Sequence, residues 1–254
     1  NEILRWRDAG GTADYATLSG SGEPTLHSGF GEVLRFLKAE LPCSAVLLTN
    51  GSLLHLPEVR AAAAEADVAK LSLSAWDDDS FRQINRPHPD LDFHRSVAGM
   101  REFRQAFSGR IWLEVFLIAD LNDAPDQVER IAALAAAIAP DKIHLNTAVR
   151  PPAESSARPV MPERLAKLAE IFRPRAEVIA DFTARPGSGV AVNETAILEM
   201  LRRRPCTARQ IADVFGMHLN EVAKYTGHLL KTGQIQAMQR AGETYFAAPE
   251  RTRT

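Results

Sequence analysis

Between residues 14 and 181, short apolar runs rich in Val, Ile and Leu alternate with longer stretches in which apolar residues recur every three or four positions. Continuous apolar runs are typical of parallel strands buried on both faces, and the amphipathic stretches are typical of the helices that connect such strands. The sequence therefore predicts an α/β fold of repeated βα units, a partial parallel (β/α) barrel. We expect strands at residues 15–19, 45–49, 69–74, 111–118, 142–146 and 177–180, and helices at 31–40, 57–66, 91–107, 125–139 and 162–172.

A second, smaller domain is expected after this barrel, which we place at residues 1–182. Residues 183–192 begin with a cluster of Pro, Gly and Ser that is typical of a linker. Beyond it, helical patterns at 193–204, 207–215 and 219–231 precede two alternating segments, 234–238 and 244–247, around Gly242. Three helices followed by a hairpin predict a winged helix-turn-helix domain over residues 193–250.

The composition narrows the class of protein. With 45% hydrophobic residues, the 254-residue chain has enough apolar side chains for packed cores in both domains. No run approaches the roughly 18 apolar residues that a membrane-spanning helix needs, so we expect a cytoplasmic protein without membrane contact. Residues 190–254 carry nine Lys and Arg against six Asp and Glu. This mild excess permits a nucleic-acid partner without requiring one.

Polar segments follow the predicted strands at their carboxyl ends, where the loops of a parallel barrel converge on one mouth. Two glycines flank Ser21 and would let a ligand approach the backbone, and Glu23 just beyond is suited to pair with an ammonium group. A tight turn with a capping glutamate explains the same residues. Ser72 and Ser74 equally fit small side chains on one side of a strand. Each segment alone leaves both interpretations open.

The order of these segments is more specific than any one of them. The first strand leads into Gly20-Ser-Gly-Glu-Pro24 and the second ends in Leu48-Thr-Asn-Gly51. The third reads Leu71-Ser-Leu-Ser-Ala75, with Ile84-Asn-Arg-Pro87 downstream. Over about residues 1–155 this order resembles the radical S-adenosylmethionine (SAM) superfamily. Residues 18–26 are most similar to its wyosine-base-synthase-like group of Fe–S oxidoreductases.

This resemblance implies an enzyme whose intact form binds SAM and a [4Fe–4S] cluster. Such an enzyme accepts an electron from a donor and generates a 5′-deoxyadenosyl radical, here for modification of a tRNA or a nucleotide. The implied cofactor-binding residues all lie at or near predicted strand ends: Ser21, Gly22, Glu23, Asn50, Ser72, Ser74, Glu114 and Asn146.

The resemblance also implies separate roles within this set. Ser21, Gly22 and Glu23 would contact the methionyl amine of SAM. Asn50 and Ser74 would lie near its ribose or carboxylate, and Glu114 and Asn146 would line the far side. Arg86 or Arg150 would meet the carboxylate or the substrate. We expect Glu23, Asn50 and Ser74 to gather around one cavity, and no catalytic residue is implied.

The cysteines depart from the superfamily pattern. Its C-x3-C-x2-C loop, whose three thiolates hold the cluster, is absent from this chain. Cys43 is expected at the entrance of a strand and Cys206 at the start of a helix in the other domain, so neither substitutes for that loop, and we expect no disulfide framework. We expect an amino-terminal truncation that removed the first strand with its cysteines, and a chain that cannot cleave SAM by itself.

Two alternatives remain open. His27, His55 and His144 lie near predicted strand ends and would suit a metal-dependent barrel hydrolase with Glu23 as a further ligand, although their spacing matches no known ligand pattern. The other alternative is a DNA-binding winged-helix regulator whose barrel senses a ligand. Helix 219–231 would then carry the contacts, as it would for docking of RNA or protein. Its outward candidates are Asn220, Lys224, Tyr225, His228 and Lys231.

Overall fold

The computed structural model describes residues 2–20, 22–148, 157–180, 194–215, 217, 219–240 and 242–249. These residues fall into two compact units, one within 2–180 and one within 194–249. The expected linker at 183–192 and two expected site residues, Ser21 and Arg150, lie outside the described residues.

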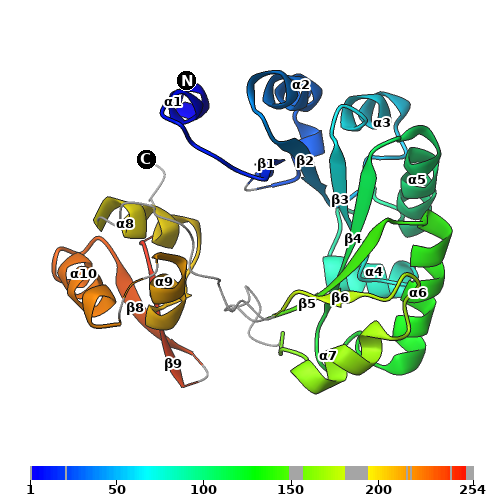
Figure 1. Ribbon diagram of the computed structural model, residues 1–254. Coiled ribbons are helices and arrows are strands. Elements are labelled where there is room, and N and C mark those ends of the chain that lie inside the picture. The colour runs from blue at the N-terminus through cyan, green and yellow to red at the C-terminus, as the bar shows by residue number, and fades with distance from the viewer. Residues whose placement is uncertain are drawn as a thin grey trace. The chain divides into compact units, whose positions relative to one another are not determined.

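Six parallel strands form the sheet of the first unit, and their order across the sheet is their order in the sequence (Figure 1). Each described strand lies within two residues of its expected bounds, because short runs of Val, Ile and Leu mark the strands of a buried parallel sheet. The strands are β1 (Tyr15–Leu18), β2 (Ser44–Thr49), β3 (Val68–Ser72), β4 (Arg110–Leu117), β5 (Lys142–Thr147) and β6 (Glu177–Val178).

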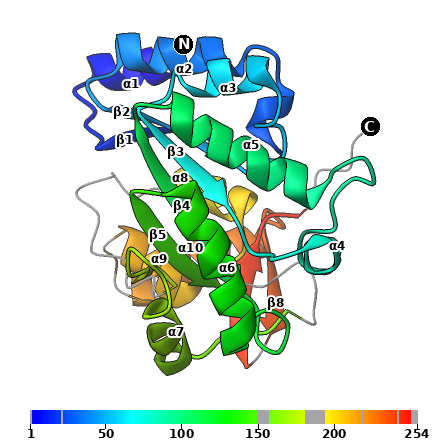
Figure 2. The same ribbon diagram turned by 90° about the vertical axis from the view of Figure 1, so that its right-hand side faces the viewer.

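Helices follow the strands, and α2, α3, α5 and α6 lie along one face of the sheet (Figures 1 and 2). Three of the helices begin with a proline in the first turn, where the missing N–H leaves no intrahelical hydrogen bond unmade. The helical elements are α1 (Glu2–Asp8), the short 3₁₀ helix η1 (Pro24–Leu26), α2 (Phe30–Glu40), α3 (Pro57–Ala63), α4 (Asp78–Asn85), α5 (Phe93–Ala106), α6 (Pro125–Ile138) and α7 (Pro162–Ala169).

The two faces of the sheet differ in polarity. Along β4, Ile111, Leu113 and Val115 are fully buried, whereas the alternate residues Trp112 and Glu114 are only partly buried. The register aligns Glu114 with Ser72 of β3 and with His144 of β5, so these side chains share the face opposite the buried one. This polar face leads to the carboxyl ends of the strands, where the sequence predicts the site.

The second unit contains three helices and a three-stranded antiparallel sheet of order β7-β9-β8. Its core is built from its own apolar residues, among them Ile197, Ile211, Val222 and Leu229. The elements are α8 (Glu194–Arg203), β7 (Cys206–Thr207), α9 (Ala208–Phe215), α10 (Leu219–Lys231), β8 (Gln236–Arg240) and β9 (Glu243–Ala247). In neither unit does a described helix have the length and apolar character that crossing a bilayer requires.

Candidate functional site

Glu23 is held in one orientation at the start of η1 by four hydrogen bonds. Its Oε1 accepts from Thr25 N (3.1 Å), Thr25 Oγ1 (2.7 Å) and Thr49 Oγ1 (2.5 Å), and its Oε2 accepts from Asn50 N (2.7 Å). The carboxylate therefore connects the loop after β1 to the turn after β2. Because Oε1 already has three donors, a further donor would approach Oε2. Capping and ligand binding are thus compatible roles for this residue.

A cavity of about 380 Å³ lies beside Glu23 at the carboxyl ends of the first strands. This volume falls within the range of roughly 300–1,000 Å³ that is typical of small-molecule sites. We call it the polar cavity. Among the described residues, five of the expected site residues line it, namely Gly22, Glu23, Asn50, Ser72 and Glu114, together with Ser19, Gly20, Pro24, Leu48, Thr49 and Lys70.

Lys70 is the charged residue of this cavity that the sequence analysis missed. Its Nζ forms an ion pair with the carboxylate of Glu114, and the two side chains are only 19% and 22% exposed. Asn146, an expected site residue that does not line the cavity, donates from Nδ2 to Glu114 Oε1 (3.2 Å). The sequence signal was a lysine inside an apolar strand, two positions before Ser72 and thus on the same face. With this pair formed, the carboxylate of Glu23 leaves the described lining of the cavity with one excess negative charge.

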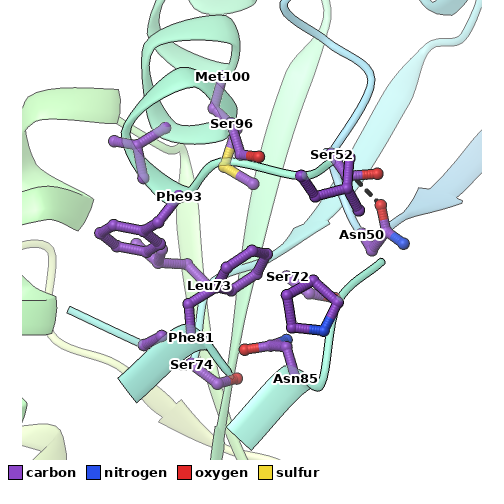
Figure 3. A pocket seen from close by; sticks show the side chains of 14 residues that line it. Asn50, Ser52, Ser72, Leu73, Ser74, Phe81, Asn85, Phe93, Ser96 and Met100 are labelled. Carbon is purple, nitrogen blue, oxygen red and sulfur yellow. Dashed lines mark hydrogen bonds between the residues drawn. The ribbon is translucent and has the colours of Figure 1, made fainter. Parts of the chain in front are cut away.

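Figure 3 shows the residues that line a second cavity, of about 100 Å³. This cavity adjoins the polar cavity and shares Asn50 and Ser72 with it. We call it the neutral cavity, because none of the 14 residues that line it is charged. Its lining comes from the loop after β2, from the end of β3 and from α4 and α5. Phe81, Phe93 and Met100 are its largest apolar side chains (Figure 3).

Ser74 lies in the neutral cavity rather than beside Glu23. Its hydroxyl accepts from Phe116 N (3.0 Å), and its carbonyl accepts from the Nδ2 of Asn122 (2.9 Å). Asn122 is completely buried, donates also to Phe116 O (2.9 Å) and accepts from Ile118 N (2.7 Å). The expected single cavity around Glu23, Asn50 and Ser74 is therefore two adjoining cavities, with Asn50 common to both.

Arg86 lines neither cavity. It ends α4 in the left-handed region (φ 47°), between Asn85 and Pro87, which both line the neutral cavity. Its side chain is exposed. The structure therefore brings Arg86 to the edge of this region without placing it in the lining.

The three histidines of the metal-hydrolase alternative are not assembled into a metal site. His27 is exposed, and its Nδ1 accepts from Gly29 N (3.1 Å). His55 Nδ1 lies 2.9 Å from the carbonyl of Ser52, and His144 lies within β5, before its carboxyl end. Among the residues that the structure describes, no group of three His, Cys, Asp or Glu side chains is suited to hold a metal ion.

The cysteines present do not fit an iron–sulfur cluster. Cys43 directly precedes β2 and so lies at the amino end of that strand, away from the polar cavity. Cys206 is buried in β7 of the second unit. The described part of the chain therefore supplies no set of thiolates for a cluster.

No protein-family model matches the chain. Among curated proteins, "GTPase Obg" of Brachyspira hyodysenteriae is 32% identical over 88% of this chain and 33% of its own length. The UPF0026 protein MJ1312 of Methanocaldococcus jannaschii is 29% identical over 63% of this chain and 49% of its length. A UPF0026 protein of Helicobacter pylori strain J99 is 29% identical over 78% of this chain and 64% of its own length. The chain thus spans about one third to two thirds of these relatives, and their names do not assign its activity.

Two solved structures share the fold. One is a domain of pyruvate-formate lyase-activating enzyme from Bacteroides vulgatus, with a TM-score of 0.52 and 17% identity over 64% of this chain and 97% of that domain. The other is a radical SAM methyltransferase from Sphaerobacter thermophilus, with a TM-score of 0.54 and 24% identity over 70% of this chain and 54% of that protein. The six-stranded parallel sheet is consistent with a partial barrel of the radical SAM type.

Proposed function

We propose that the polar cavity binds SAM and that the whole protein is a radical SAM enzyme. The main support is that one cavity is lined by five residues that the sequence predicted from separate segments: Gly22, Glu23, Asn50, Ser72 and Glu114. The fold shared with a radical SAM methyltransferase supports the same class. When bound, the [4Fe–4S] cluster of such enzymes supplies the electron that cleaves SAM. The two described cysteines, Cys43 and Cys206, do not supply the set of thiolates that would hold this cluster.

The residues of the cavity suit the polar groups of SAM. In this proposal the Oε2 of Glu23 accepts from the methionyl ammonium, because Oε1 is already occupied by three donors. The side-chain Nδ2 of Asn50 and the hydroxyl of Ser72 have no hydrogen-bond partner among the described residues and are available to hydroxyl or carboxylate oxygens. The excess negative charge of the cavity complements SAM, whose ammonium, sulfonium and carboxylate sum to one positive charge.

Replacing Glu23 by Gln tests this assignment. The change keeps the size of the side chain but removes its charge and places an amide against donors. We expect the affinity for SAM to fall at least tenfold, corresponding to about 1.4 kcal/mol, in isothermal titration calorimetry. S-adenosylhomocysteine, which lacks the sulfonium charge, should bind the unmodified chain more weakly than SAM.

Glu32→Gln is the matched control, because Glu32 is an exposed carboxylate in the first turn of α2 and lines neither cavity. Equal affinities of the Glu23 and Glu32 variants, or no saturable SAM binding by the folded chain, would contradict the proposal. For the whole protein, anaerobic reconstitution followed by chromatography should detect 5′-deoxyadenosine. The resemblance favours tRNA or a nucleotide as the molecule to be modified.

For the second unit, we interpret α8, α9, α10 and the β8–β9 hairpin as a winged helix-turn-helix domain. The positive φ of Gly242 at the hairpin turn (81°) and the short β7 paired with β9 support this interpretation. On α10, Lys224 and Lys231 are exposed, whereas Tyr225 packs partly against the core and His228 Nε2 lies 3.5 Å from Glu194. The side chain of Asn220 lies outside the described set.

These exposed cations favour docking of nucleic acid over the alternative of a purely structural unit. In a DNA-binding regulator, a gel-shift titration would show binding that weakens steeply with salt, because phosphate contacts release counterions. Sequence-specific DNA binding without SAM binding would support the regulator instead of the enzyme.

A further inference from the structure

The neutral cavity has an interior of buried apolar side chains and a mouth of exposed polar residues. Leu73, Phe93, Val97 and Met100 in its lining are each less than 10% exposed. Phe81 forms a further wall, with its ring centroid 5.6 Å from that of Phe93 (Figure 3). Aromatic walls at this spacing favour a flat apolar group placed against them.

The exposed residues of the lining are all neutral and polar. They are Asn50, Ser72 and Asn85, and two of them belong also to the polar cavity. The side-chain amide of Asn85 and the hydroxyl of Ser72 have no hydrogen-bond partner among the described residues. A ligand in this cavity would therefore bury an apolar body and keep a hydrogen-bonding edge at the mouth, toward the polar cavity.

Size and charge define the class of that ligand. A cavity of about 100 Å³ is smaller than the roughly 150 Å³ that encloses benzene, but it is open at its mouth, so one six-membered ring inserted edge-on is the fitting size. An ionised group would lose its hydration without meeting an opposite charge from the described residues, because none of those that line the cavity is charged.

From these features we infer that the neutral cavity is a substrate site for a single uncharged heteroaromatic ring, held beside the ligand of the polar cavity. This inference rests on the proposed function in that it treats the neighbouring ligand as SAM. The ring's buried part packs against the wall formed by Phe81, Phe93 and Met100, and its polar edge meets the Asn85 amide. The ring thereby presents its mouth-side atoms to the neighbouring cavity through the shared Asn50 and Ser72.

Methionine methyl NMR tests the inference on the 254-residue chain with 2-pyridone, a neutral six-membered ring with one donor and one acceptor, as the probe. The Met100 methyl group lines the cavity and is assigned by the Met100→Leu variant, whereas Met161, 64% exposed, serves as an internal reference. We expect a saturable shift of the Met100 resonance and none of Met161. Benzoate and benzylammonium, rings that carry a charge, should produce no saturable shift.

Two variants and one competition make the test specific. Asn85→Ala should weaken 2-pyridone binding about tenfold by removing the amide at the mouth, whereas Gln83→Ala, an exposed change on the same helix outside the lining, should not. With SAM at saturation, 2-pyridone should still bind. If SAM itself displaces 2-pyridone from Met100, the ring in the cavity is that of the cofactor and the substrate assignment is overturned.

The same data separate this inference from the proposed function. Absence of a saturable Met100 shift overturns the ring site even if SAM binds. A Met100 shift without any SAM binding contradicts the proposed function and supports the ring site by itself. Equal affinities of the Asn85 and Gln83 variants overturn the role of the mouth amide and with it the class of ligand.

Discussion

At the scale of single residues, Gly22 is a glycine that the packing of the chain does not require, whereas Gly51 is one that it does. A Cβ built on Gly22 meets no atom of the described residues within 4 Å, and its φ lies outside the positive region that only glycine adopts readily. By contrast, Gly51 has φ of 73° and a Cβ there would lie 2.4 Å from the Met100 methyl carbon. The chain's own packing thus explains Gly51 and does not explain Gly22.

We therefore predict that Gly22→Ala leaves the free energy of unfolding within about 0.5 kcal/mol of the unmodified chain. The added methyl group would enter the polar cavity, so the affinity for SAM should fall about tenfold or more. Thermal denaturation and calorimetric titration measure the two effects separately. A variant with unchanged affinity for SAM would show that no ligand approaches this part of the backbone.

At the scale of elements, Asn122 joins the carboxyl ends of β3 and β4. We predict that Asn122→Ala destabilises the first unit by about 3 kcal/mol, because it leaves the buried carbonyls of Ser74 and Phe116 and the Ile118 N–H without partners. All three tryptophans, Trp6, Trp76 and Trp112, lie in this unit. Urea unfolding followed by tryptophan fluorescence therefore reports its stability.

Asn85→Ala is the control for this prediction, since Asn85 is exposed and its side chain joins no two elements. Equal unfolding midpoints of the two variants would show that the backbone hydrogen bonds between β3 and β4 hold the ends of these strands together without Asn122.

The elements also show what the sequence can predict. Short apolar runs predicted the strands, as in β4, expected at 111–118 and observed at Arg110–Leu117. The acidic run at residues 77–79 predicts the start of a helix, since carboxylates suit a first turn, but it does not predict where that helix ends. The observed α4 begins there, with Asp77 accepting from Ser80 N (2.9 Å) as its cap. The strand expected at 69–74 extends past the observed end of β3 at Ser72. The sequence does not distinguish a Ser74 hydroxyl that faces a ligand from one that accepts from Phe116 N.

At the scale of the whole molecule, the site depends on the register between strands. The sequence order predicted that Gly22, Glu23, Asn50 and Glu114 converge, because parallel strands end at one edge. The Lys70–Glu114 ion pair and the division into two cavities depend on which residues lie opposite one another across β3 and β4, and a single sequence does not contain that register.

The polar face of the sheet also makes the stability of the first unit depend on pH. Burial, aided by the positive charge of Lys70, lowers the pKa of His144 below its ordinary value of 6.5. Glu177 and Glu114 oppose this shift, and Lys142 adds to it. The Nδ1 of His144 is buried without a partner among the described residues, which is consistent with a neutral ring.

Because the pKa of His144 is lower in the folded than in the unfolded state, the unfolded chain binds more protons below pH 6.5, and stability falls as the pH falls through that range. We predict that the free energy of unfolding decreases more between pH 7.5 and 5.5 for the unmodified chain than for His144→Gln, which cannot titrate. Urea unfolding followed by tryptophan fluorescence gives the free energy of unfolding of each chain as a function of pH. The difference between the two curves removes the contributions of other histidines and carboxylates. Parallel curves would mean that His144 is protonated equally easily in both states, and its burial on the polar face would then carry no energetic consequence.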